Sequence, residues 1–414
     1  MTKRVAVIAY HSSPLLEPGS GDAGGMTVYV RQLAAALAER DCYTDIYTRA
    51  SSPEDRMVTI SPGVRVIPVA AGPRSIVSKE ELPRHIDEFV ASIKANATVQ
   101  RIAYDVIHSH YWQSGIAAKR LVDTWKVPFV HSPHTLARVK NSNLAPDDVP
   151  EPGTRIAGEE SIIASADVLI ASADDEYQAL ACMYKAPHDS LKVLSPGVDH
   201  SVFFPGDKAA ARRAMDLPAE RPILLFAGRI QRLKGVDLAI RSLAELAASR
   251  TDRPLLVVVG GASGPGGETE LHRLKSIAQE LGVSRDVIFK GPMPHAQLAE
   301  MYRAADVTLV CSYSESFGLA ALEAHASGCP VVGTPVGGLS HIVSDGRSGI
   351  LIGNHDPAVF APAVAKVIDA RHDGSFSSAA YEESLRFSWQ NTADSFLQLY
   401  ECLIEEKFPE LCTC

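Results

Sequence analysis

The stretch ILLFAGRIQRLKGVDLAIRSLAELAAS (223–249) decides the fold. It opens with a short continuous apolar run, which is typical of a buried strand. A loop carrying Arg229 and Lys234 follows, and after Gly235 the apolar residues recur at helical spacing. A strand, a loop and an amphipathic helix in this order predict one half of a β–α–β unit.

The same alternation runs along the whole chain. Strand candidates in the first half are VAVIAY (5–10), TDIYT (44–48), VRVIPV (64–69), DVIHSH (105–110), FVHSPH (129–134), DVLIAS (167–172) and LKVLSPG (191–197). Those in the second half are ILLFAGR (223–229), LLVVVGG (255–261), DVIFKG (286–291), DVTLVCS (306–312), CPVVGT (329–334) and GILIG (349–353). Strands separated by helices predict parallel sheets with crossover connections.

A Pro- and Gly-containing segment, SPGVDHSVFFPGDK (195–208), divides the strand series and is interpreted as a linker. The length of 414 residues also favours two domains over one. We therefore expect an α/β protein with an N-terminal domain over 1–198 and a C-terminal domain over 199–388, both doubly wound and facing a cleft. Ligands of such sheets bind beyond the carboxyl ends of the strands.

Composition excludes several classes of protein. The net charge of −9 argues against nonspecific binding to nucleic acid or anionic membranes. No apolar run approaches the ~20 residues of a membrane-spanning helix, so stable membrane insertion is not expected. The seven cysteines are scattered, which favours a reducing cytoplasm. The terminal CTC (412–414) is interpreted as a frayed tail, with metal binding or intermolecular pairing as alternatives.

A glycine pattern, G-x-G-x-x-G, occurs at Gly19, Gly21 and Gly24. A nicotinamide-binding fingerprint would follow its strand almost immediately, but eight residues separate Tyr10 from Gly19. The second strand also ends in Arg49 rather than in an acidic residue for a ribose. What remains is a glycine loop, Gly24-Gly25, that leads into a helix and lets backbone amides approach an anion or a sugar.

Four histidines lie at predicted strand ends, and they are His108, His110, His131 and His134. The spacings suit zinc, but no cysteine or carboxylate completes a set of four ligands nearby. Polar lining of the cleft is the favoured interpretation. For His108 and His131 a role in the core remains an alternative.

Arg229 and Lys234 form a natural clamp for a diphosphate beside a helix start, although two cations in a loop can also be solvated surface. Residues 316–319 open another helix directly after a strand, and such a terminus favours negative charge. Glu315 and Glu323 flank this start, where carboxylates accept from sugar hydroxyls. Glutamates are also common in the first turns of helices for electrostatic reasons alone.

Several stretches in this order resemble the retaining family 4 glycosyltransferases of GT-B fold. They are GGMTVYV (24–30), GRIQRLKG (228–235), ESFGLAALE (315–323) and ASGCPVVGTPVGG (326–338). Further stretches are similar to the branch of mycothiol biosynthesis that joins GlcNAc from UDP-GlcNAc to an inositol phosphate. These are HSSPLLEPGSGDAGGM (11–26), AAGPRSIVSKEELP (70–83), YDVIHSHYWQSG (104–115), HSPHTLARVKN (131–141) and YRAAD (302–306).

The resemblance implies roles for individual residues. It implies an acceptor-phosphate pocket of Lys79, Tyr111, Thr135 and Arg155, with His11 and the Asp22–Thr27 loop facing the acceptor. It implies a donor site of Gly25, Arg229, Lys234, Met293, Glu315, Ser316, Phe317, Gly318, Leu319 and Glu323. Within it Glu315 holds the sugar, Glu323 the ribose, and the two cations the diphosphate; His134 lies beside the reacting carbon. It also implies that a terminal helix over 389–414 returns to the N-terminal domain.

Three positions depart from the family pattern. Thr27 replaces an asparagine, Glu17 a glutamine and Met293 an arginine. These differences indicate an altered donor or acceptor, such as an aminocyclitol or a zwitterionic thiol in antibiotic biosynthesis.

The expected chemistry is transfer of a hexose-type sugar from a nucleotide-sugar to a small polar acceptor. The leaving diphosphate accepts the acceptor's proton, so no protein nucleophile and no cofactor is required; Mg²⁺ is compatible with the site but is not needed. No nucleic-acid partner is expected, and a homodimer is compatible with the sequence. A nucleotide-sugar epimerase and a non-catalytic sensor are the alternatives from other classes.

Overall fold

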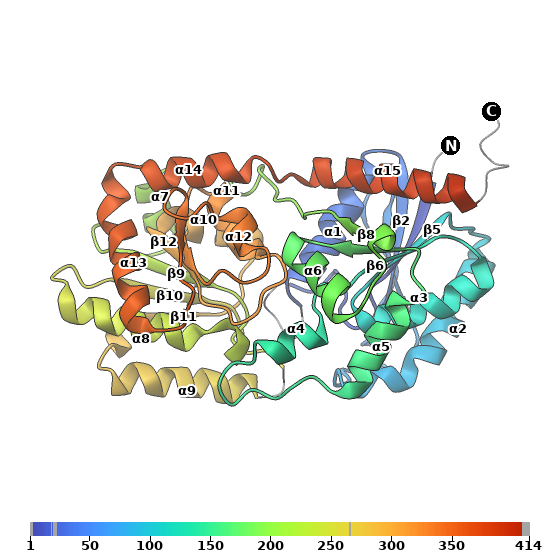
Figure 1. Cartoon of the computed structure of the whole chain (residues 1–414), viewed down its shortest axis with the longest axis horizontal. Helices are drawn as coiled ribbons and strands as arrows, with labels where there is room; N and C mark the ends of the chain where they lie inside the picture. Colours follow the sequence, from blue (N-terminus) through green and yellow to red (C-terminus); the bar gives the residue numbers. More distant parts are fainter. Residues whose placement is uncertain (1–2, 18, 20–22, 265, 408–414) are drawn as a thin grey trace.

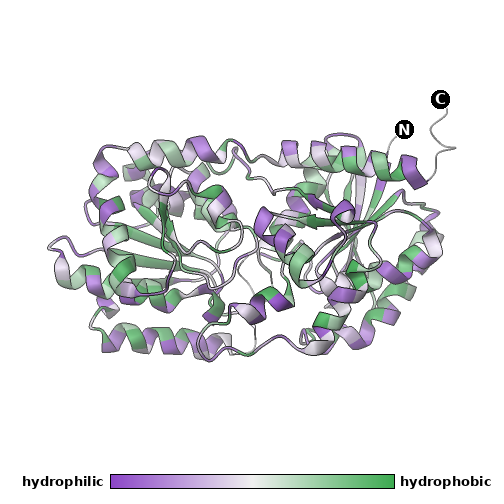
Figure 2. Cartoon of the chain, in the orientation of Figure 1, coloured by the Kyte–Doolittle hydropathy of each residue, from purple (hydrophilic) through white to green (hydrophobic). Residues whose placement is uncertain are grey.

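The computed structural model describes residues 3–17, 19, 23–264 and 266–407. Two α/β halves lie side by side along the long axis, each with a central sheet covered by helices (Figure 1). The strands at the centre of each half are mostly hydrophobic, whereas the helices carry hydrophilic residues outward (Figure 2). This arrangement confirms the α/β class predicted from the sequence. Within the described residues no helix is long and apolar enough to cross a bilayer.

The sheet of the first half has the strand order β3-β4-β2-β1-β5-β6-β7-β8. Its strands are β1 (Lys3–Ile8), β2 (Cys42–Arg49), β3 (Val58–Ser61), β4 (Val64–Val69), β5 (Val106–His110), β6 (Phe129–Ser132), β7 (Val168–Ala171) and β8 (Leu191–Val193). All pairs are parallel except β3 with β4, which is antiparallel. The sequence analysis missed β3, because this short edge strand is largely exposed and lacks an apolar run.

The sheet of the second half has the order β11-β10-β9-β12-β13-β14 and is parallel throughout. Its strands are β9 (Ile223–Ala227), β10 (Leu255–Val259), β11 (Val287–Lys290), β12 (Val307–Val310), β13 (Val331–Gly333) and β14 (Gly349–Leu351). Each matches a predicted apolar run. The buried β10 is aliphatic throughout, as expected of a parallel strand covered on both faces.

Helices connect the strands in both halves. In the first half they are α1 (Gly25–Ala38), η1 (Leu82–His85), α2 (Ile86–Gln100), α3 (Trp112–Trp125), α4 (Ala137–Ser142), α5 (Gly153–Ile163), α6 (Asp174–Met183) and η2 (His188–Ser190). From residue 208 onward they are α7 (Lys208–Ala214), η3 (Arg232–Lys234), α8 (Val236–Ser249), α9 (Gly267–Glu280), η4 (Ser284–Asp286), α10 (His295–Ala304), α11 (Leu319–Ala326), α12 (Leu339–Ile342), α13 (Pro357–Asp369), η5 (Ala370–His372), α14 (Ser375–Ser384) and α15 (Trp389–Lys407).

The terminal helix α15 lies along the first half, although it follows the last helix of the second (Figure 1). Its residues Trp389, Phe396 and Tyr400 are buried in one cluster with strands and α1 of the first half. An ion pair between Lys3 and Glu401 (2.6 Å) joins its outer side to β1. The helix therefore completes the core of the first half, although it follows the second half in the sequence.

The chain crosses between the halves twice, and the two crossings lie side by side. Val198 and Ser388 form an isolated parallel bridge. A Cβ at Gly197 would lie 2.1 Å from the backbone nitrogen of Trp389, so the close approach requires glycine. The first crossing lies within the predicted linker segment 195–208, and the domain boundary between 198 and 199 stays a prediction.

Candidate active site

A cleft of about 980 Å³ lies between the two halves, beyond the carboxyl ends of the strands. Sixteen of the predicted site residues line it. They are His11, Gly25, Lys79, Tyr111, His134, Thr135, Arg155, Arg229, Lys234, Met293, Glu315, Ser316, Phe317, Gly318, Leu319 and Glu323. Residues from both halves of the chain therefore line the same cleft.

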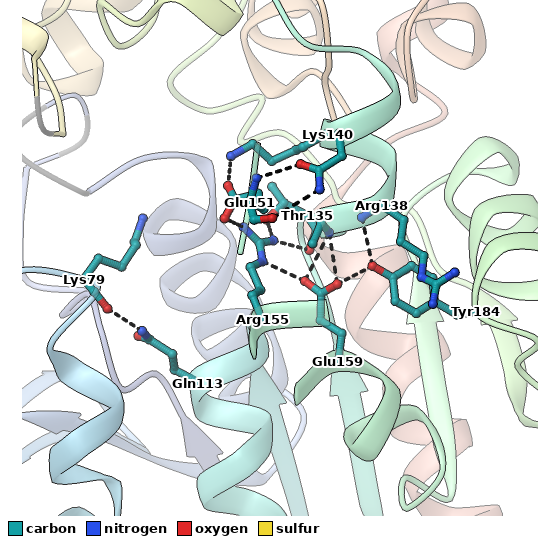
Figure 3. Close-up of polar contacts among 11 residues, drawn as sticks. Lys79, Gln113, Thr135, Arg138, Lys140, Glu151, Arg155, Glu159 and Tyr184 are labelled. Carbon is teal, nitrogen blue, oxygen red and sulfur yellow. Dashed lines mark hydrogen bonds and ion pairs between the residues drawn. The ribbon is translucent and has the colours of Figure 1, made fainter. Parts of the chain in front are cut away.

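On the first half, Tyr111 is the centre of a cationic cluster. It follows β5 with a left-handed φ of 73° and begins α3. The Lys79 nitrogen lies 5.4 Å and the Arg155 guanidinium carbon 5.0 Å from the centroid of its ring. Gln113 donates to the carbonyl of Lys79 (2.8 Å) and so fixes that backbone beside α3 (Figure 3).

Arg155 is buried and is held from several directions. Its Nη2 donates to the carbonyl (3.1 Å) and to Oγ1 (2.9 Å) of Thr135, and its Nε donates to Glu159 (2.8 Å). Its Nη1 pairs with Glu151 at 2.9 Å, and Glu151 also pairs with Lys140 (Figure 3). The four residues predicted for the acceptor-phosphate pocket are thus brought together. The structure adds Glu151, Glu159 and Lys140 to this group.

Sequence reasoning missed these three partners. Glu151, Arg155 and Glu159 follow one another at intervals of four, which is a readable signal for one face of a helix. Lys140 carried no comparable signal, because it reaches Glu151 only through the fold of the loop between α4 and α5.

The strand-end histidines divide into a cleft group and a core group. His134 lines the cleft with a left-handed φ of 60°, and its Nε2 lies 2.8 Å from Nδ1 of His110. Burial lowers the pKa of His134 to about 3, so its ring is neutral at neutral pH. His108 bonds Tyr400 (2.7 Å) in α15, and His131 bonds a serine of β5. Both are buried, as the alternative core interpretation expects.

The cations of the second half lie on the loop after β9. Lys234 in η3 forms an ion pair of 2.5 Å with Glu315. Gly235 ends this turn at a φ of 64°, and a Cβ there would lie 2.1 Å from the carbonyl oxygen of Cys311. A Cβ on Gly24 would lie 3.2 Å from Nε of Arg229, so the glycine loop of the first half packs closely on this side chain.

Helix α11 begins at Leu319 after Gly318, whose φ is 98°. Its first residues, Leu319 and Ala320, line the cleft, and the amides of such a helix start favour an anion. The hydroxyl of Ser316 donates to the carbonyl of His134 and so joins the two halves directly. The predicted diphosphate clamp and helix start therefore line one side of the cleft, opposite the cationic cluster.

The charge of Glu323 differs from the one that the sequence indicated. The side chain is buried in α11 and accepts a hydrogen bond from the hydroxyl of Tyr302 (3.2 Å). Burial raises the pKa of Glu323 to about 8, despite the opposing effect of that bond. At neutral pH the group is therefore an acid that both donates and accepts, rather than the carboxylate that the sequence indicated.

One predicted acceptor residue, Thr27, does not line the cleft. Thr27 is buried within α1, and its hydroxyl donates to the carbonyl of Gly24 (2.7 Å) instead of facing the cleft. The predicted contact of Asp22 lies outside the described residues. Met293 lines the cleft as expected, whereas Glu17 is exposed and is not among the lining residues.

Over residues 3–17, 19, 23–264 and 266–407, no group of three or more His, Cys, Asp or Glu side chains is arranged to hold a metal ion. The expectation that transfer requires no cofactor stays a prediction. The CTC tail lies outside the described residues.

Two family models match the chain. One, described as glycosyl transferase 4-like domain, matches residues 24–197, and the other, glycosyl transferases group 1, matches residues 207–383. Together with the cleft and the two sheets, these matches define the class: the chain is a glycosyltransferase of GT-B fold and belongs to family 4. The epimerase and sensor alternatives have no such support.

More particular relatives are enzymes named D-inositol 3-phosphate glycosyltransferase. That of Acidothermus cellulolyticus is 46% identical over 98% of this chain and 91% of its own length. That of Corynebacterium jeikeium is 45% identical over 96% of each chain. The solved sucrose-phosphate synthase from Thermosynechococcus elongatus has a TM-score of 0.90 and 31% identity, covering 98% of this chain and all of that one. Anabaena HepE, solved with UDP-glucose, shares the fold at a TM-score of 0.76 and 17% identity, covering 96% of this chain and 99% of its own.

Proposed function

We propose that this enzyme transfers a hexose-type sugar, of the UDP-GlcNAc class, from a nucleotide-sugar to an inositol phosphate. The observation that carries the proposal is the cluster of Lys79, Tyr111, Thr135 and Arg155 at one end of the cleft. Lys79 and Arg155 can only donate, which suits a phosphate monoester. The names of the relatives at 46% and 45% identity support the same acceptor.

The opposite side of the cleft suits the donor. In this proposal Arg229 and Lys234 bind the diphosphate, the start of α11 stabilises its remaining charge, and Glu315 binds the sugar; all of them line the cleft. Neutral Glu323, with Tyr302 behind it, suits the ribose hydroxyls, because an acid can accept from one hydroxyl and donate to the next. Met293 lines the cleft and packs against the base in this proposal.

Transfer proceeds with retention in this proposal. The acceptor hydroxyl attacks the face of the sugar that the diphosphate leaves, and its proton passes to the departing phosphate oxygen. No protein nucleophile is involved. The protein stabilises the charge that develops on the diphosphate, through Lys234, Arg229 and the amides of α11. His134, neutral and fixed by His110, lies beside the reacting carbon.

One observation favours a second acceptor class. Glu151 places a carboxylate on the acceptor side of the cleft, where an ammonium group could bind it. An aminocyclitol or a zwitterionic thiol of an antibiotic pathway, with another nucleotide-sugar, would use this contact.

A panel of nucleotide-sugars and acceptors, read by mass spectrometry, tests the proposal. We expect transfer to D-inositol 3-phosphate and none to unphosphorylated inositol, and an unchanged anomeric configuration in the NMR spectrum of the product. Preferential transfer to an aminocyclitol would select the second class, and an inverted anomer would refute the mechanism. A cytoplasmic location, independence from Mg²⁺ and a homodimer stay predictions.

A further inference from the structure

The acceptor side of the cleft contains an anion of its own. The carboxylate of Glu151 lies between Lys140 and Arg155, with one oxygen toward each (Figure 3). All three side chains line the cleft. The exposed fraction of the Glu151 side chain is 19%, against 3% for Arg155, so Glu151 is the more accessible partner.

Arg155 has limited capacity for another anion. Its bonds to Glu159 and Thr135 use the single hydrogen of Nε and both hydrogens of Nη2. Its Nη1 is the nitrogen that remains, and Glu151 contacts it at 2.9 Å. A phosphate that takes two contacts from Nη1 must therefore replace Glu151 there.

The backbone of Glu151 is independently fixed. The side chain of Asn141 accepts from its amide (2.7 Å) and donates to its carbonyl (3.2 Å). The carboxylate can therefore rotate away from Arg155 while the loop stays in place. Lys140, which has a flexible four-carbon side chain, then keeps its charge at the same wall.

We propose that Glu151 determines the charge specificity of the acceptor site, because an acceptor must carry enough negative charge to displace this carboxylate from Arg155. After displacement Lys140 becomes a further ligand of the acceptor anion. The inference rests on the proposed phosphate acceptor. A phosphate monoester carries a charge of about −1.5 to −2 at pH 7 and three acceptor oxygens, so it competes better than a carboxylate or a neutral polyol.

Charges around Glu151 agree with this role. Burial acts to raise the pKa of the group, but Arg155 and Lys140 together bring it below its ordinary value. Glu151 is thus ionised at neutral pH, where a phosphate monoester is also an anion, and the two anions compete for the same cations.

A purely structural role gives a different expectation. In that case Glu151 ties α4 to α5 through its two ion pairs, and its loss should loosen the pocket. The substitution Glu151→Gln separates the two roles, since glutamine keeps the size and one accepting oxygen but removes the charge. Glu160→Gln is the matched control, because Glu160 pairs with Arg138 between the same two helices, with side chains 47% and 40% exposed.

The experiment measures binding of inorganic phosphate and of D-inositol 3-phosphate by calorimetry, together with acceptor KM in the presence of a nucleotide-sugar. For Glu151→Gln we expect binding of both anions to tighten about tenfold, since one repelling charge at contact distance is removed. Binding of UDP and the unfolding temperature should not change. Lys140→Met should weaken anion binding about tenfold, in both the native and the Glu151→Gln background. Glu160→Gln should match the native enzyme.

Weaker or unchanged binding of phosphate by Glu151→Gln overturns the inference, as does an effect of Glu160→Gln of equal size. The outcome is separable from that of the proposed function. If phosphate binding tightens but no inositol phosphate is glycosylated, the acceptor assignment fails while the competition stands. If transfer occurs and Glu151→Gln has no effect on KM, the competition fails while the acceptor assignment stands.

Discussion

The two sides of the cleft hold their cations in different ways. On the acceptor side Arg155 is 3% exposed and is paired with Glu159, which is equally buried. On the donor side Lys234 lies on a short turn after β9, and both it and its partner Glu315 are 19% exposed. The acceptor cation is part of the packing between α4 and α5, whereas the donor cation belongs to a loop.

This difference indicates that the two cations contribute to different properties of the enzyme. A cation that is built into a helix pair is rigid and shapes a fixed pocket, and its removal leaves a buried charge without a partner. A cation on a loop contributes little to the core, and its value lies in the charge that develops during the reaction. We therefore expect changes on the acceptor side to lower stability and changes on the donor side to lower turnover.

The largest expected effect is on the donor side. Lys234→Ala should lower kcat by about 10²- to 10³-fold, because it removes a donor to the leaving diphosphate, while acceptor KM changes little. Steady-state kinetics with both substrates varied measure the two constants. The control is Arg232→Ala, which changes a cation of the same turn that contacts Pro146 and Asp147 of the other half. Equal losses of kcat in both variants, or an unchanged kcat for Lys234→Ala, would contradict the expected difference between the two sides of the cleft.

The next effect is on stability. Arg155→Met should lower the free energy of unfolding by about 3–5 kcal/mol, since it leaves the carboxylate of Glu159 buried without its ion-pair partner. Urea denaturation followed by fluorescence measures this loss. A double variant that also carries Glu159→Gln should recover much of it, and Lys234→Ala should lose under 1 kcal/mol. A larger loss for Lys234→Ala than for Arg155→Met contradicts the comparison.

The third effect is the smallest when it is counted per pH unit, and it sharpens the donor side, because Glu323 is its one buried acid among the residues discussed. Its pKa is raised from 4.5 to about 8, so between these values the folded state holds a proton that the unfolded state has released. Its contribution to stability is complete below pH 4.5 and is lost as the pH rises to about 8. The loss is up to about 1.4 kcal/mol per pH unit relative to Glu323→Gln.

Unfolding free energies of the native enzyme and Glu323→Gln, measured from pH 5 to pH 9, provide the test. The glutamine variant should gain on the native enzyme up to about pH 8 and then run parallel to it. Parallel curves throughout would show that Glu323 is ionised at neutral pH, as the sequence analysis assumed.

Much of the fold follows from local patterns. The apolar runs predict the buried strands, because parallel strands covered on both faces must be apolar along their whole length. The edge strand β3 escaped this rule, since Val58 and its neighbours are exposed and pair with only one strand. Helix α8 begins and ends where its apolar periodicity does.

The site was predictable where a motif fixes both the residue and its surroundings. Lys79, Tyr111 and Arg155 meet as the family resemblance implied, although they come from three separate segments. Thr27 does not reach the wall, because its hydroxyl is satisfied by the preceding turn of its own helix. The sequence could not predict that Glu323 keeps its proton, because the pKa of this side chain depends on how completely the surrounding fold excludes water from α11.

The position of α15 has a consequence for synthesis of the protein. Trp389, Ala393, Phe396 and Tyr400 complete a core whose other buried members lie before residue 199, and Tyr400 is hydrogen-bonded to His108. A ribosome adds about 5–20 residues per second, so the early strands wait about 10–40 s for the intervening 190 residues. The later half has all its strands and helices before α15 is made, whereas the first half needs the end of the chain to complete its core.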